Sequence, residues 1–204
     1  MMKSNLKFSN KAKTLQKLKV HFKEKINIPT FLFFTKKEII KNDNAIKQVS
    51  KKFKNIQIII RSSALDEDNY NNSNAGKYDS VILKNPTIDR IKNGLKKIFI
   101  KLKSEKDIVI FQKLIIKPEI FGVAFTRDIN TNAPYYVINF DRSKKTNLIT
   151  SGKKSASQKT LNILKKSQII PKEFQKLFNI IKDIEKASNN DRLDIEFAIK
   201  NKKI

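Results

Sequence analysis

The 204-residue sequence contains no cysteine, which excludes disulfides, thiol chemistry and cysteine-ligated metal sites. It has one histidine, His21, so a zinc site and a Ser-His-Asp triad are disfavoured as well. We interpret His21 as a surface residue of a helix rather than a catalytic base. No run of eighteen apolar residues occurs, and the N-terminus lacks an apolar signal region. We therefore expect no membrane span, no secretory signal and a cytoplasmic location.

Glycine is also scarce, with four residues in the chain. None of them forms a GxGxxG pattern, and Gly152-Lys153 lacks both the preceding glycine and the adjacent hydroxyl of a Walker A loop. There is no HExxH motif and no serine-nucleophile elbow either. The common short motifs for dinucleotide binding, P-loop chemistry and zinc proteolysis are therefore missing.

Acidic residues are few, 19 against 44 lysines and arginines, which gives a formal net charge of +25. Such a charge is typical of nucleic-acid-binding proteins. Here the lysines are scattered over every segment, and asparagine and isoleucine are abundant together with lysine, as a genome-wide codon bias would produce. We favour a solvated lysine-rich surface and keep a basic scaffold or nucleic-acid-binding protein as the alternative function.

Apolar periodicity predicts alternating helices and strands in a chain that is 39% hydrophobic. The predicted helices cover residues 11–26, 36–53, 88–102, 157–166 and 171–187, and the predicted strands cover 31–34, 56–60, 108–116, 122–126, 135–140, 148–150 and 193–199. This order indicates an α+β protein. We expect one domain over residues 1–204, with two lobes at about 1–105 and about 106–204.

The stretch from Ile58 to Ser80 combines a buried strand with a polar loop. Three isoleucines lead into Arg61 and two serines, and the following loop ends at Gly76 and Lys77. A fixed cation and small polar residues after a buried strand favour binding of a phosphorylated ligand. The acidic residues at 66–68 are better interpreted as loop structure than as a metal site.

The last predicted strand carries Asp194 and Glu196 on one face, roughly 6.6 Å apart along the strand. Mg²⁺ takes one or two carboxylates and completes its octahedron with phosphate oxygens and water. The pair therefore fits a magnesium site. The polar outer face of an ordinary half-exposed strand explains the same alternation, and the pattern alone leaves both interpretations open.

Several segments together resemble the nucleotide-binding domain of phosphoenolpyruvate synthase and pyruvate, phosphate dikinase. The main one is RSSALDED…SNAGKYDS at residues 61–80. Further pieces follow the order of that family: KAKTL at 11–15, IPTFLFFT at 28–35, IVIFQKLI at 108–115, FGVAFTRDINT at 121–131 and LDIEFAI at 193–199. The resemblance covers essentially the whole chain.

The resemblance implies an ATP-grasp-like fold in which two α+β lobes hold ATP and Mg²⁺. In that family the domain transfers a phosphoryl group from ATP to a histidine on a separate domain. Carried over by position, Lys11 and Arg61 bind phosphates, with Arg61 as the catalytic residue. The corresponding loop residues Ser73, Ala75 and Gly76 cover the phosphates, Gln112 lies at the adenine hinge, and Glu196 with Asp194 holds the metal.

Three departures from the family pattern stand out. Ser9-Asn10 replaces a glycine pair, residues 141–152 lack the glycine-rich and acidic character common in the family, and no strand with a Gln and an Arg follows residue 199. We therefore expect a domain truncated at its C-terminus. It would be a fragment, a degenerate copy, or a split-gene product whose partner chain carries the phosphohistidine and phosphoenolpyruvate domains.

Overall fold

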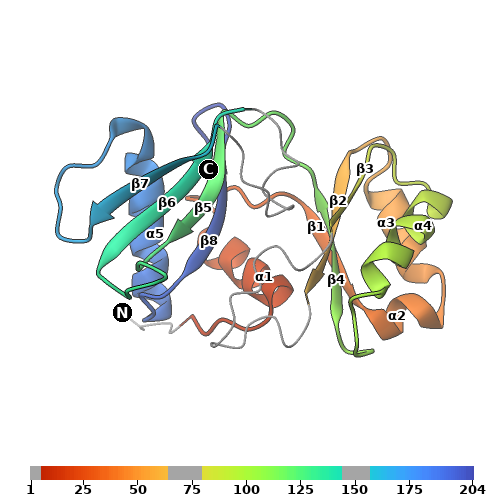
Figure 1. Cartoon of the computed structure of the whole chain (residues 1–204). Coiled ribbons are helices and arrows are strands. Elements are labelled where there is room, and N and C mark those ends of the chain that lie inside the picture. Colours follow the sequence, from red (N-terminus) through yellow and green to blue (C-terminus); the bar gives the residue numbers. More distant parts are fainter. Residues whose placement is uncertain (1–5, 64–79, 144–156) are drawn as a thin grey trace.

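The computed structural model describes residues 6–63, 80–143 and 157–204, and these form two four-stranded antiparallel sheets (Figure 1). The first sheet has the order β1-β4-β2-β3 and the second β7-β6-β5-β8. The strands are β1 Phe31–Thr35, β2 Ile58–Ser63, β3 Ser80–Leu83, β4 Ile108–Lys113, β5 Ile120–Phe125, β6 Tyr135–Asp141, β7 Lys159–Leu164 and β8 Asp194–Ile199. This architecture confirms the predicted α+β class.

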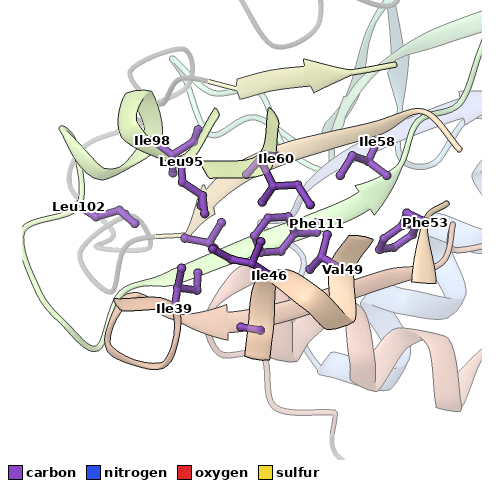
Figure 2. Close-up of a cluster of buried hydrophobic side chains, with 13 residues drawn as sticks. Ile39, Ile46, Val49, Phe53, Ile58, Ile60, Leu95, Ile98, Leu102 and Phe111 are labelled. Atoms are coloured by element: carbon purple, nitrogen blue, oxygen red, sulfur yellow. The ribbon is translucent and has the colours of Figure 1, made fainter. Parts of the chain in front are cut away.

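Three helices cover one face of the first sheet: α2 Lys36–Lys41, α3 Asn44–Lys52 and α4 Ile88–Phe99. Figure 2 shows the core between these helices and the sheet, to which β2 contributes Ile58 and Ile60. Strand side chains alternate between faces, so Arg61 lies on the opposite face of this sheet. The helical core thus leaves the other face available for polar groups.

The second sheet packs against α5 (Gln175–Ser188), which follows a short 3-10 turn at Lys172–Phe174. In β8, Phe197 and Ile199 belong to this core. The alternate residues of the strand therefore point away from α5. No helix in the described part of the chain is long and apolar enough to cross a membrane.

Helix α1 (Lys11–His21) lies between the two sheets (Figure 1). Its Ala12 packs with Ile108 and Ile110 of the first sheet. Phe22, directly after the helix, packs instead with α5. The segment therefore contributes to two separate cores, with Leu15 in the first and Leu18 in the second. The Asn10 side chain caps the helix by accepting a hydrogen bond from the Lys13 N–H at 3.0 Å.

The prediction of one continuous helix over residues 36–53 was wrong, because the helical conformation is interrupted at Asn42. The backbone there is extended, and the Asn42 side chain accepts a hydrogen bond from the Asn44 N–H at 2.9 Å. A side chain that binds nearby backbone competes with the helical hydrogen bonds. Two short helices, α2 and α3, result.

The predicted helix over residues 157–166 was also wrong, since β7 occupies most of that segment. Six residue pairs join β7 to β6, and Ile163 opposite Tyr136 is buried. Pairing with a neighbouring strand outweighed local helical spacing. The strand predicted at 148–150 lies outside the described residues.

The chain passes from the first sheet to the second between Lys113 and Ile120. The predicted lobe change at about residue 105 is therefore too early, because β4 pairs with β1 and β2. The apolar run that includes β4 gave no signal of which sheet it would join. Its partners come from far earlier in the sequence.

Gly122 lies where β5 and β6 approach each other closely. A Cβ at this position would lie 2.0 Å from the Asn139 carbonyl oxygen and 2.8 Å from the Phe140 Cα. We expect Gly122→Ala to lower the free energy of unfolding by about 3 kcal/mol or more, because backbone must move. The measurement is urea denaturation.

Gly94→Ala is the matched control. At Gly94 the nearest atom to an added Cβ is the flexible Ile60 Cδ1 at 3.1 Å, and alanine favours the helix by about 1 kcal/mol. We expect a change within about 1 kcal/mol. Equal stabilities of Gly122→Ala and the wild type would contradict the close approach.

Candidate functional site

Three charged side chains from three different elements meet between the sheets. The Glu196 carboxylate accepts a hydrogen bond from the Lys11 Nζ at 3.0 Å. The Arg61 Nη2 donates to both Glu196 oxygens, at 2.7 and 2.5 Å. Lys11 begins α1, Arg61 lies on β2 of the first sheet, and Glu196 lies on β8 of the second sheet. One carboxylate thus connects both sheets and the helix between them.

Alternation of side chains places these residues toward the interior between the sheets. In β8, Phe197 faces α5, so Asp194 and Glu196 share the opposite face, as the sequence predicted. In β2, Ile60 faces the helical core, so Arg61 takes the other face. The geometry of the site therefore follows from the faces of β2 and β8 that carry Arg61 and Glu196, each opposite the face that packs against helices.

Opposing effects set the charge of Glu196. Burial by itself raises the pKa of this carboxyl, but the positive charges and hydrogen bonds of Arg61 and Lys11 lower the pKa to about 2. The Glu196 side chain remains 37% exposed, so solvent and solutes reach it. It is an ionised carboxylate at neutral pH and accessible to a competing ligand.

Asp194 behaves differently on the same strand face. Burial raises the pKa of its carboxyl, the neighbouring negative charge of Glu196 raises it further, and Lys11 partly offsets both, giving a pKa of about 6. The two cations lie on Glu196 rather than on Asp194. Asp194 is therefore the carboxylate that gains most from an additional cation.

Measured without metal, the pH dependence of the free energy of unfolding should reflect the raised pKa of Asp194. The folded value of about 6 lies above the ordinary 3.8, so the folded state keeps a proton that the unfolded state loses. The Asp194 contribution to the free energy of unfolding is therefore largest below pH 4 and falls as pH rises from 4 to 6. Denaturant unfolding at stepped pH should show this fall in the wild type and not in Asp194→Asn. Superimposable pH profiles for the two proteins would contradict it.

The residues present fit a magnesium ion that is coordinated both by protein carboxylates and by a phosphate. Asp194 and Glu196 provide two carboxylates on one face, the number that Mg²⁺ uses beside phosphate oxygens and water. Among the described residues, no group of three or more His, Asp or Glu side chains could hold a metal alone. Two protein carboxylates leave the remaining positions of such an ion to phosphate oxygens and water.

Gln112 lies on β4, on the same sheet face as Ile108 and Ile110, which pack against α1. Its register partners are Phe31 on β1 and Ile59 on β2. It is thus on the face that carries Arg61. Ser73, Ala75 and Gly76 lie outside the described residues, as does the acidic cluster at 66–68. His21 is exposed at the end of α1, away from the Lys11 end.

Sequence reasoning missed a polar network that fixes the start of β8. The buried Thr126 hydroxyl donates to the Asp191 carbonyl at 2.7 Å and accepts from the Leu193 N–H at 2.7 Å. Arg127 forms an ion pair with the Asp191 carboxylate at 2.6 Å. These contacts hold the strand in the register that presents Asp194 and Glu196. The only sequence signal was Thr126-Arg127 directly after β5, and their shared partner Asp191 lies more than 60 residues away.

Glu185 and Lys165 extend this network. Glu185 accepts from the Tyr136 hydroxyl at 2.7 Å and pairs with the Lys165 Nζ at 2.5 Å. Burial, together with this acidic partner, raises the pKa of Tyr136. The two charged side chains are only 18% and 13% exposed and satisfy each other. We therefore assign this cluster a structural role in joining α5 to the second sheet.

Comparison with known proteins supports the fold. The structure is similar to the crystal structure of D-alanyl-alanine synthetase A from Vibrio cholerae O1 biovar eltor str. N16961, with a TM-score of 0.53 and 14% sequence identity. The match covers 93% of this chain and 51% of that chain, so the chain spans about half of that protein's length. No protein-family model and no curated protein matches the sequence. Two sheets that face each other across a shared ion-pair cluster, together with this neighbour, establish an ATP-grasp-like fold.

Proposed function

We propose that this chain is the ATP-binding domain of a dikinase-type phosphotransferase of the phosphoenolpyruvate synthase kind. The observation that carries the proposal is the meeting of Lys11 and Arg61 with the Glu196 carboxylate between the two sheets. Two cations and a carboxylate from opposite lobes are the groups that a metal-complexed polyphosphate requires. The similarity of residues 61–80 to that family's signature favours the dikinase type over other ATP-grasp activities.

The ion pairs of Glu196 suggest how the phosphates of ATP would bind. Glu196 supplies two negative oxygens to Lys11 and Arg61, and these are the contacts that phosphate oxygens would make. In the proposed complex the phosphates take over both cations. Asp194 and Glu196 would hold a magnesium ion, which would neutralise charge on the transferring phosphoryl group. The carboxylate therefore serves in turn as a partner of the cations and as a metal ligand.

The other residues receive roles from their positions. Gln112 on β4 would bind the adenine edge, because it shares a sheet face with Arg61. Lys11 would add its charge at the N-terminus of α1, where the helix dipole also favours an anion. Ser73, Ala75 and Gly76 would cover the phosphates with backbone N–H groups. Arg61 would stabilise the charge that develops during transfer.

The acceptor in this proposal is a histidine on another domain or on a separate chain that also carries the phosphoenolpyruvate domain. His21 is unsuited to the role, because it lies at the far end of α1 from Lys11. Within this chain the chemistry is positioning of the phosphates and neutralisation of their charge. Recognition of the final acceptor would belong to the other domains.

A thermal-shift experiment tests the proposal. With Mg²⁺ present, ATP at 100 times its dissociation constant should stabilise the wild type by about 2.7 kcal/mol. Adenosine alone should have a smaller effect, because it lacks the phosphates. No shift with ATP, together with tight binding of nucleic acid that weakens steeply with salt, would instead support the basic-scaffold alternative.

A further inference from the structure

Two adjacent serines at the end of β2 have buried hydroxyls. Ser62 is 4% exposed and Ser63 is 1% exposed. In the part of the chain that the structure describes, neither hydroxyl has a hydrogen-bond partner. Buried polar groups are almost always paired, and an unpaired hydroxyl destabilises the folded state. For an unpaired hydroxyl beside a candidate ligand site, an atom of the ligand is therefore a candidate hydrogen-bond partner.

The two serines point to opposite faces of the sheet. Ser62 alternates with Ile58 and Ile60, so it points into the helical core. Ser63 lies two residues after Arg61, roughly 6.6 Å along the strand, and its side chain therefore points to the same face as Arg61. Ser63 is thus the unpaired hydroxyl on the face that carries the candidate site.

The neighbouring strand confirms where Ser63 points. Its register partner on β4 is Ile108. Side chains directly opposite in an antiparallel pair share a face. Ile108 packs against Ala12, the residue after Lys11 in the first turn of α1. Ser63 therefore lies on the sheet face that carries Arg61, opposite a residue that packs with the first turn of α1.

We propose that the Ser63 hydroxyl donates a hydrogen bond to a phosphate oxygen of the bound nucleotide, as a third phosphate contact beside Lys11 and Arg61. The inference rests on the proposed ATP site and adds a residue to it. The phosphate would supply the hydrogen-bond partner that the buried Ser63 hydroxyl lacks. Ser62, on the other face, has no ligand within reach and takes no part in binding.

The test compares Ser63→Ala with Ser62→Ala, which remove equally buried hydroxyls from adjacent positions. Calorimetric titration with Mg²⁺ and ATP, and separately with Mg²⁺ and inorganic tripolyphosphate, should show about a tenfold loss of affinity in Ser63→Ala for both ligands. Ser62→Ala should bind both as the wild type does. Neither variant should melt below the wild type, since each loses an unpaired hydroxyl.

The outcomes separate this inference from the function it rests on. If the wild type binds Mg²⁺-complexed ATP and Ser63→Ala binds it equally well, the Ser63 contact is overturned and the ATP site stands. Equal losses in both serine variants also overturn it, because they would indicate a general effect of β2. If the wild type binds neither ligand, the proposed function itself is overturned.

Discussion

Replacing Arg61 with alanine is expected to weaken binding of Mg²⁺-complexed ATP by about 100-fold, or about 2.8 kcal/mol. Arg61 makes two hydrogen bonds to the carboxylate that we regard as standing in the place of the phosphates. The substitution removes these charge-assisted donors. It also leaves the Glu196 charge beside the incoming phosphates with one cation fewer. Isothermal titration calorimetry measures the loss.

Arg142→Ala is the control for loss of an arginine and its ion pair. Arg142 pairs with Glu173 at 2.5 Å, and both side chains are more than 40% exposed. Both variants should remain folded. The exposed Arg142 pair contributes about 0–1 kcal/mol, and Glu196 keeps Lys11 as a partner in Arg61→Ala. The result that counts against the site is an Arg61→Ala protein that binds ATP as tightly as Arg142→Ala does.

Glu196→Gln is expected to act in opposite directions with and without metal. The Glu196 carboxylate is ionised at neutral pH and forms ion pairs with both cations. Without Mg²⁺, the neutral amide should therefore raise the affinity for tripolyphosphate by about tenfold, because repulsion and competition are removed. With Mg²⁺, the variant should lose most of the additional affinity that the metal gives the wild type, because a strong metal ligand is gone.

The control is Glu173→Gln, which neutralises a surface glutamate that also pairs with an arginine. It should shift neither affinity. A Glu196→Gln protein whose metal-free affinity falls along with its metal-dependent affinity would show that the carboxylate only supports the fold. A rise in affinity without Mg²⁺ and a loss of affinity with Mg²⁺ are expected together only of a carboxylate that competes with the phosphates and also binds the metal.

Arg61 and Glu196 were candidates from strand patterns and Lys11 from the family resemblance, but the ion pairs that join the three could not be predicted. Short-range alternation in β8 placed Asp194 and Glu196 on one face, and the apolar run before Arg61 fixed the end of β2. The separation of 135 residues between Arg61 and Glu196 is bridged only in the folded chain. Local patterns therefore gave the faces of the strands, whereas sheet packing determined which faces meet.

The errors arose where tertiary pairing or a local polar contact outweighed periodicity. Residues 159–164 form a strand because β6 offers an edge, which no local pattern records. Asn42 interrupts a helix through its own side chain. Thr126 and Asp191, which hold the start of β8, are linked by a contact across 65 residues. The unpaired hydroxyl of Ser63 is likewise visible only when burial is known.

Calorimetric titration of the wild-type chain with ATP in the presence and absence of Mg²⁺ tests the central claim most directly. The claim is that Lys11, Arg61 and Glu196 form a site in which a polyphosphate and a metal bind together. It predicts one ATP per chain, bound at least about tenfold more tightly with Mg²⁺ than without, since Glu196 opposes the free anion and binds the metal complex. Absence of heat under both conditions, or an affinity that does not depend on Mg²⁺, would contradict it.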